Sequence, residues 1–208
     1  MIPDRDPISR NVPPERRPVK EEPPAEEQLK FIRDVMARTS TFTAVPGWGA
    51  VGMGVFALIA AYVASIVTSR DTWLITWMVV AASAASLGSI ALYLKSKKAN
   101  APLLSGPGRK FLASFLPPLF VGAVLTIALW HAGAPSLLPG TWMLMYGASV
   151  LAGGAYSVRI IPVMGMLFLG LGALTLFLPH AWGNVLMAVT FGGLHIVFGL
   201  LIAKYHGG

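Results

Sequence analysis

The carboxylate side chains are the residues best suited to acid–base chemistry, and the sequence keeps them out of its apolar segments. Eight of the nine acidic residues precede position 35, and the ninth is Asp71. Hydrolytic enzymes need paired carboxylates or a Ser/His/Asp arrangement. Ion-coupled transporters place ionisable groups near the middle of the membrane. The distribution therefore disfavours both a membrane hydrolase and an ion-coupled transporter.

His195 is the one titratable side chain near the middle of an apolar segment, and Gly192 and Gly199 share its helical face. Its imidazole could ligate haem or a metal, bind a quinone carbonyl, or relay a proton. The alternative is an interhelical hydrogen bond to a serine, a threonine or a backbone carbonyl. The other histidines lie at or beyond the ends of apolar segments: His131, His180 and His206. We therefore expect no cofactor and no metal, and His195 remains the one candidate ligand.

Small residues recur at helical spacing in several apolar segments, and such faces let two backbones pack closely in lipid. We expect these positions to be helix-packing sites rather than the lining of a substrate path: Ala81, Ala85, Ser89, Ser149, Gly153, Ser157, Ala188, Gly192 and Gly199. The polar residues of the last two segments are expected to hydrogen-bond across helices: Thr175, Asn184 and Thr190.

Basic residues cluster between the apolar segments. The run GPGRK over 106–110 lacks the spacing of a phosphate-binding loop, so we interpret it as a flexible basic loop. Arg159 is expected to act as a topology anchor, with an anionic headgroup site as the alternative. Six side chains are predicted to lie at the level of the lipid headgroups: Lys95, Lys97, Lys98, Arg109, Lys110 and Arg159. These residues are too scattered for a nucleic-acid module.

Composition and hydropathy indicate which elements position these residues. The chain of 208 residues is 55% apolar and 12% charged, against about 45–50% and about 25% in soluble domains. The absence of cysteine excludes disulfides and thiolate metal sites. The sequence predicts an all-α, polytopic membrane helix bundle. Its six predicted spans are residues 48–68, 73–94, 115–131, 141–158, 162–179 and 183–203.

The N-terminal part of the chain differs from the rest. Residues 1–25 are rich in proline and charge and are predicted to form a disordered cytoplasmic tail. The following segment is 26–45, and within its residues 26–42 the large apolar side chains fall within a helical arc of roughly 160°, with charged residues opposite. We interpret it as an amphipathic juxtamembrane helix that rests on the bilayer or docks a partner protein. The transmembrane domain then covers 46–208.

The distribution of lysine and arginine predicts the topology. Fifteen of the sixteen basic residues fall on one side of the predicted spans, and only Arg70 falls on the other. The positive-inside rule places both termini in the cytoplasm. The expected partners are the bilayer and the anionic lipids of its cytoplasmic leaflet. Tryptophans are expected at the outer ends of the spans: Trp73, Trp130, Trp142 and Trp182.

The spans group into three predicted hairpins, 48–94, 115–158 and 162–203, each with a tryptophan near the start of its second helix. The stretch 164–203, MGMLFLGLGALTLFLPHAWGNVLMAVTFGGLHIVFGLLIA, has a glycine-rich helix, a Leu-Pro turn and a second helix with spaced glycines. This pattern resembles the hairpin repeats of HdeD-type acid-resistance membrane proteins. The resemblance implies a small six-span protein of the bacterial inner membrane.

Three further segments, FIRDVMARTSTFTAVPGWG, PLLSGPGRKFL and GGLHIVFGLLIA, are similar to uncharacterised bacterial membrane proteins of this size. Neither resemblance implies catalytic residues. We therefore expect a non-enzymatic protein with a structural, stress-related or regulatory role, acting through helix packing, a protein partner or a second copy, and its cytoplasmic tail. The alternatives are a small passive transporter or channel for an uncharged solute, and an intramembrane enzyme or redox subunit built around His195.

Overall fold

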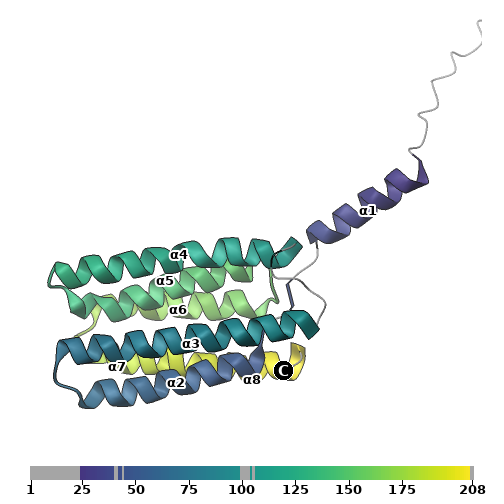
Figure 1. Ribbon diagram of the computed structural model, residues 1–208. Helices are drawn as coiled ribbons and strands as arrows, with labels where there is room; N and C mark the ends of the chain where they lie inside the picture. Colours follow the sequence, from purple (N-terminus) through teal and green to yellow (C-terminus); the bar gives the residue numbers. More distant parts are fainter. Residues whose placement is uncertain (1–23, 40–41, 44, 99–103, 105, 207–208) are drawn as a thin grey trace, which may run out of the picture. The chain divides into compact units, whose positions relative to one another are not determined.

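The computed structural model describes residues 24–39, 42–43, 45–98, 104 and 106–206 (Figure 1). Nearly all of these residues are helical, and their only β-type pairing is one bridge between Phe42 and Ser157. The predicted all-α class is therefore confirmed. Most of the predicted disordered tail, residues 1–23, lies outside the described residues. The chain divides into two units, Met1–Met36 and Ala37–Gly208, and helix α1 (Ala25–Thr39) begins in the first.

Five helical segments in the described part of the chain are long and apolar enough to cross a membrane. They are α2 (Gly47–Ile66), α3 (Arg70–Lys98), α4 (Gly106–His131), α6 (Ile160–Phe177) and the C-terminal segment Trp182–Tyr205. The C-terminal segment comprises α7 (Trp182–Met187), the π-helix η2 (Ala188–Leu194) and α8 (His195–His206). The remaining predicted span, residues 141–158, corresponds to α5 (Leu138–Gly154), which has 17 residues and follows a short 3-10 turn, η1 (Pro135–Leu137).

Helix α4 begins earlier than the sequence suggested. Residues 106–110, predicted to be a flexible basic loop, form its first turn. Gly106 has a φ of 51°, a left-handed conformation that glycine adopts without a side-chain clash, and Pro107 follows it. Proline is well tolerated in a first helical turn because its missing N–H has no partner there. The prediction failed because it interpreted the Gly-Pro-Gly run as a break rather than as a helix start.

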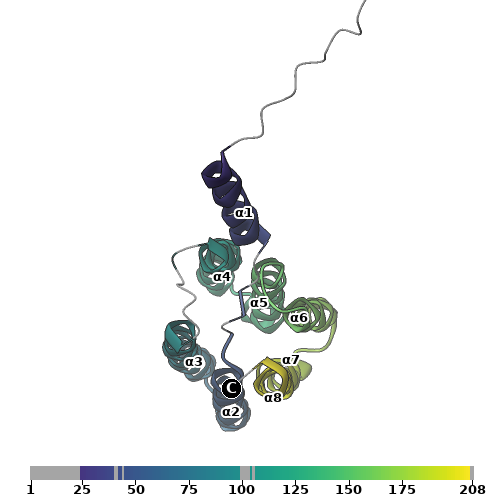
Figure 2. The same ribbon diagram turned by 90° about the vertical axis from the view of Figure 1, so that its right-hand side faces the viewer.

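The helices of the second unit lie in the order α3, α2, α8, α6, α5 and α4 around the bundle (Figure 2). Helix α3 packs chiefly on α2, and α4 packs chiefly on α5. Helix α6 packs mainly on α5, whereas the C-terminal segment packs mainly on α2. The last two spans therefore contact each other less than each contacts another helix, which differs from a tight third hairpin.

Glycines explain the two closest helix contacts. In each of four glycine pairs, a Cβ added to one glycine would lie 2.6–3.6 Å from the backbone carbonyl oxygen of the other. Two pairs join α5 to α6, and two join α2 to the C-terminal segment. Within each helix the two glycines are seven residues apart, which is two helical turns, so they share one face. The pairs are Gly140 with Gly172, Gly147 with Gly165, Gly47 with Gly199, and Gly54 with Gly192.

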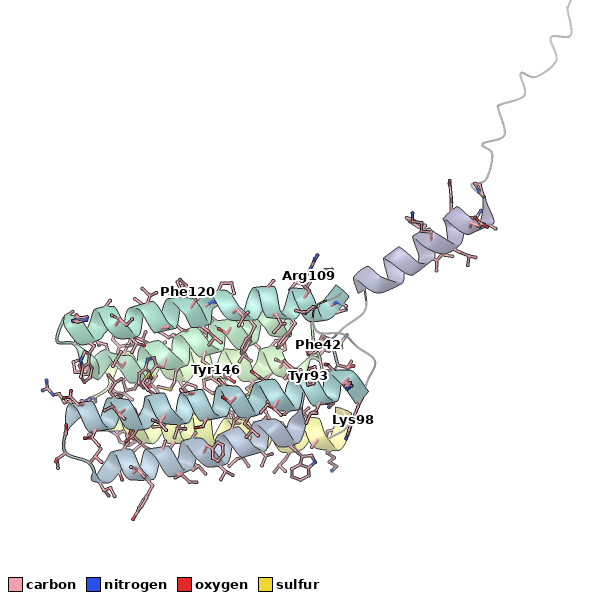
Figure 3. All side chains as sticks on the ribbon, viewed as in Figure 1. Phe42, Tyr93, Lys98, Arg109, Phe120 and Tyr146 are labelled. Carbon is pink, nitrogen blue, oxygen red and sulfur yellow. The ribbon has the colours of Figure 1, made fainter. Side chains whose placement is uncertain are left out.

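The outer surface of the bundle is strongly apolar. Only 6% of the most apolar stretch of α3, and of α4, is buried, against 39% for α2 and for the C-terminal segment. Phe120, for example, projects outward from α4 and is 72% exposed (Figure 3). An apolar surface of this extent is unfavourable in water and is typical of contact with lipid. The fold therefore indicates a multi-pass membrane protein.

Charged residues gather at one end of this bundle, where α3 ends, α4 begins, α5 turns into α6 and α8 ends (Figure 1). Arg70 lies at the other end, at the start of α3. We call the first end the basic end, after these residues: Lys95, Lys97, Lys98, Arg109, Lys110, Arg159 and Lys204.

Candidate functional site in the bundle interior

Two polar side chains from different helices meet inside the bundle. The hydroxyl oxygen of Tyr146, on α5, lies 2.6 Å from Nε2 of His195, the first residue of α8. His195 is 4% exposed. Tyr146 adjoins Gly147, which contacts α6, and His195 lies between two glycines that contact α2. The two side chains therefore lie on helices that glycine contacts join to different neighbours, and their hydrogen bond links α5 to α8 directly. Figure 3 labels Tyr146 near the middle of α5.

The surroundings of His195 assign the roles of its two ring nitrogens. Nδ1 is buried and makes no hydrogen bond, but the backbone carbonyls of Thr190 and Phe191 lie near the ring. Carbonyl oxygens only accept, so a proton on Nδ1 suits that side of the ring. Nε2 is then the acceptor, and the Tyr146 hydroxyl donates to it. Both carbonyls belong to the π-helix η2, a type of turn that frequently occurs at functional sites.

Aromatic rings surround this pair. The ring of Phe168 lies 5.0 Å from that of Tyr146 and 5.5 Å from that of His195, measured between centroids. Phe191 and Phe115 lie 5.3 and 6.3 Å from Tyr146. An apolar environment disfavours a charged imidazole and strengthens the hydrogen bond. The arrangement can tie α5 to α8 through the Tyr146–His195 hydrogen bond. No group of three or more metal-ligating side chains occurs among the described residues.

A second polar cluster surrounds Asn184 on α7. Its side-chain oxygen accepts hydrogen bonds of 3.2 Å from the indole N–H groups of both Trp73 and Trp77 on α3. Its amide nitrogen donates to the carbonyl of Ala61 on α2, also at 3.2 Å. Trp73 stacks on Trp142 of α5, with centroids 5.5 Å apart. This cluster therefore links α2, α3, α5 and the C-terminal segment near the end of the bundle opposite the basic end.

Several residues that the sequence predicted to form contacts between helices are placed differently in the structure. Thr175 and Thr190 do not bond across helices; each donates to the carbonyl four residues earlier in its own helix. A threonine hydroxyl within a helix readily reaches that carbonyl. Ala81, Ala85 and Ser89 are exposed, so their predicted packing role stays a prediction. Buried or half-buried positions within helices are Ser149, Gly153, Ala188, Gly192 and Gly199. The predicted helix-packing role of Ser157 is wrong, because Ser157 lies beyond the end of α5 and pairs with Phe42.

The basic and remaining histidine side chains lie away from the Tyr146–His195 pair. Lys95 donates a 2.9 Å hydrogen bond to the carbonyl of Val45, next to the start of α2. His131 and His180 are exposed, and the side chain of His206 lies outside the described part of the structure. The remaining side chains predicted at headgroup level are also exposed: Lys97, Lys98, Arg109, Lys110 and Arg159.

Sequence analysis missed Tyr146 and six of the eight paired glycines: Gly47, Gly54, Gly140, Gly147, Gly165 and Gly172. The signal for the glycines was their seven-residue spacing, because Gly47 and Gly54 repeat the pattern of Gly140 and Gly147. Tyr146 carries a hydroxyl in the middle of an apolar segment, which is itself a signal for a polar partner. Comparison with protein-family models, curated proteins and solved structures finds no match for this chain. The site is therefore interpreted from its own geometry.

Proposed function

We propose that the chain crosses the bacterial inner membrane six times, with both termini in the cytoplasm. Helix α5, the fourth span in chain order, is added to the five helical segments that are long enough to cross. Its 17 residues rise about 25 Å, and they pack between α4 and α6, which are both long enough to cross. The gathering of basic residues at one end of the bundle supports a cytoplasmic location for that end.

We further propose that the protein is not an enzyme and has a structural, stress-related or regulatory role. The observation that carries this proposal is the backbone-to-backbone contact at the four glycine pairs. Such contacts hold α5 against α6, and α2 against the C-terminal segment, at fixed separations, as a scaffold requires. The faces left for interaction are then the outer surfaces of α3 and α4 and the apolar face of α1.

Complementation tests this role. In cells that lack the gene, the full chain is compared with a variant lacking residues 1–39, under acid stress first because of the HdeD-type resemblance. The truncated variant is expected to accumulate in the membrane and to fail in complementation. Full rescue by the truncated variant would place the function in the transmembrane domain alone.

The alternative of a passive channel for an uncharged solute is favoured by the polar atoms of Tyr146 and His195 in the interior. Proteoliposomes that contain the purified chain are diluted into isotonic glycerol, and their swelling is followed by light scattering. Our proposal expects the rate of protein-free vesicles. Faster swelling that His195→Leu abolishes would support the channel instead.

A further inference from the structure

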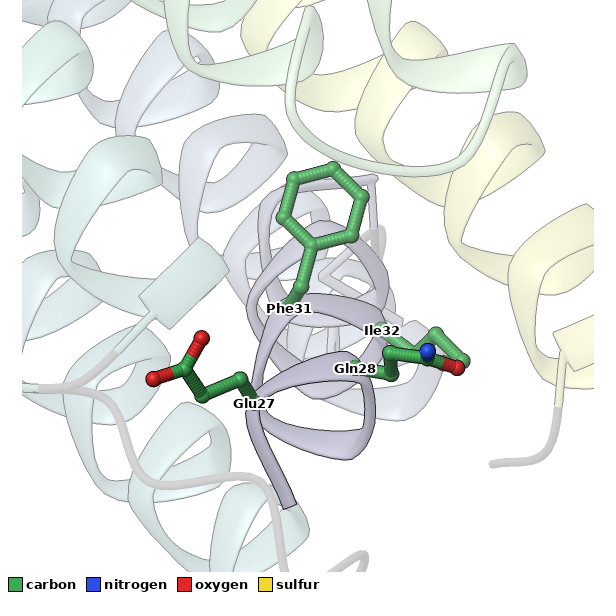
Figure 4. Close-up of a pocket in the computed structure, with 4 residues that line it drawn as sticks. All are labelled: Glu27, Gln28, Phe31 and Ile32. Atoms are coloured by element: carbon green, nitrogen blue, oxygen red, sulfur yellow. The ribbon is translucent and has the colours of Figure 1, made fainter. Parts of the chain in front are cut away.

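Helix α1 exposes large apolar side chains. Leu29, Phe31 and Ile32 are 54%, 70% and 52% exposed. Phe31 and Ile32 border a shallow surface depression together with Glu27 and Gln28 (Figure 4). Single exposed apolar residues are common, but three within one helical turn form an apolar face that water solvates poorly. We therefore expect this apolar face to contact lipid or protein rather than water.

The chain is attached to the bundle three residues after α1 ends at Thr39. The backbone N–H of Phe42 donates to the carbonyl of Tyr156 at 2.7 Å, and the hydroxyl of Ser157 donates to the carbonyl of Phe42 at 2.6 Å. The Phe42 ring is buried against Phe111, with centroids 5.3 Å apart. Three extended residues span about 10 Å, so the tether between this attachment and α1 is short.

The attachment lies at the basic end, where aromatic residues suited to the lipid headgroup region are also exposed. Trp48 is the second residue of α2 and Tyr93 lies near the end of α3, and both side chains are exposed. Tryptophan and tyrosine concentrate at membrane–water interfaces. Because the tether is short, α1 stays close to the bilayer surface, so the effective concentration of that surface is high. A partner protein free in solution has no such advantage.

The charges of α1 indicate how it would bind. The helix holds three acidic and three basic residues, so it has no net charge: Glu26, Glu27, Asp34, Lys30, Arg33 and Arg38. It therefore lacks the charge complementarity that a strongly acidic or basic protein partner would require. Insertion of apolar side chains into the boundary between headgroups and acyl chains needs no such charge.

We propose that α1 lies in the cytoplasmic interface of the bilayer, with Leu29, Phe31 and Ile32 in the lipid. This inference rests on the proposed topology and names the surface that the N-terminal region binds. It also predicts that binding is independent of anionic lipid, because the neutral helix binds through its apolar face.

Spin labelling of the full chain in lipid nanodiscs tests the proposal, since the chain contains no cysteine. Labels at Ile32→Cys and Lys30→Cys report the two faces of one helical turn, and Phe120→Cys is the reference for lipid exposure. Collision with oxygen should exceed collision with a water-soluble nickel chelate at 32 and 120. The reverse is expected at 30. Leu29→Cys provides a second label on the apolar face if Ile32→Cys perturbs the helix.

Each other outcome is informative. Ready access of the nickel chelate to residues 29 and 32, with residue 120 still in lipid, would overturn the interfacial location and leave the topology standing. Shielding of residue 32 from both reagents would indicate a protein partner instead. A lipid signal at 32 that requires anionic lipid would overturn the apolar mode of binding. Access of the chelate to residue 120 would contradict the membrane location itself.

Discussion

Helices α5 and α6 contact each other through glycines at two levels, whereas only 6% of the apolar stretch of α3 is buried. The α5–α6 pair and α3 are both apolar, so hydropathy does not distinguish the two regions. The two regions differ in whether their small residues contact small residues of a neighbouring helix. The glycines of α5 and α6 face each other across a shared contact, but the side chains of Ala81, Ala85 and Ser89 on α3 are exposed.

The comparison teaches that small residues bring two helix backbones into direct contact where both helices supply them at matching levels. The pairs of α2 with the C-terminal segment repeat the arrangement of α5 with α6. In the contacts of the outer helices α3 and α4, a glycine instead meets a side chain, as Gly52 meets Leu87, and polar groups add bonds such as that of Trp77 with Asn184. We therefore expect substitutions to cost most at the glycine pairs and least on the outer face of α3.

The largest effect is expected at the α5–α6 contact. A Cβ at Gly147 would lie 2.8 Å from the backbone nitrogen of Leu169 and 2.9 Å from the carbonyl of Gly165. Backbone cannot move aside as a side chain can, so Gly147→Ala should lower the free energy of unfolding by about 2–3 kcal/mol. The matched control is Gly170→Ala, because nothing lies within 4 Å of its Cβ. Unfolding in mixed detergent micelles measures both, and equal effects would contradict the close contact.

The next largest effect is expected at Asn184. Replacing Asn184 with leucine leaves two indole N–H groups and the Ala61 carbonyl without their partner. Hydrogen bonds between membrane helices contribute about 0.6 kcal/mol each, so the free energy of unfolding should fall by about 2 kcal/mol. Trp73→Phe removes one of these donors and should cost less. Detergent unfolding measures both variants, and the reverse order would argue against Asn184 as the centre of the cluster.

A smaller effect is expected at the Tyr146–His195 pair, which makes one interhelical hydrogen bond. His195→Leu should lower the free energy of unfolding by about 1–2 kcal/mol at most, and His195→Gln by less. A double-mutant cycle with Tyr146→Phe should give a coupling free energy of about 0.6 kcal/mol. The purified chain is also expected to show no haem absorbance and no stoichiometric metal. A Soret band that His195→Gln removes would instead support the redox alternative.

The smallest effect is expected on the outer face of α3. Ala85 is exposed, so Ala85→Leu should change the free energy of unfolding by no more than about 0.5 kcal/mol. Ala60 on α2 is buried in the core, and Ala60→Leu should destabilise the bundle by about 1–3 kcal/mol. A strong effect of Ala85→Leu, together with a change in oligomeric state by light scattering, would show that a second copy covers this face.

Hydropathy and charge predicted the helical class and the location of the apolar helices, because both depend on segment composition. They did not predict the partner of each helix. The match between Gly147 and Gly165 depends on relative depth, which no single segment encodes. His195 was recognisable as a polar residue in an apolar segment, but its partner Tyr146 is 49 residues away in sequence. The start of α4 was missed because Gly-Pro-Gly initiates some helices and interrupts others.

Cysteine labelling on either side of α5 tests the six-span topology most directly, since the chain has no cysteine of its own. Ala132 lies between α4 and α5, and Tyr156 lies between α5 and α6; both are exposed. With a membrane-impermeant maleimide on intact cells whose outer membrane is permeable to it, we predict labelling of Ala132→Cys. Tyr156→Cys and Lys97→Cys should react only after the inner membrane is permeabilised. Labelling of Ala132→Cys and Tyr156→Cys from the same side would contradict the crossing of α5 and with it the six-span account.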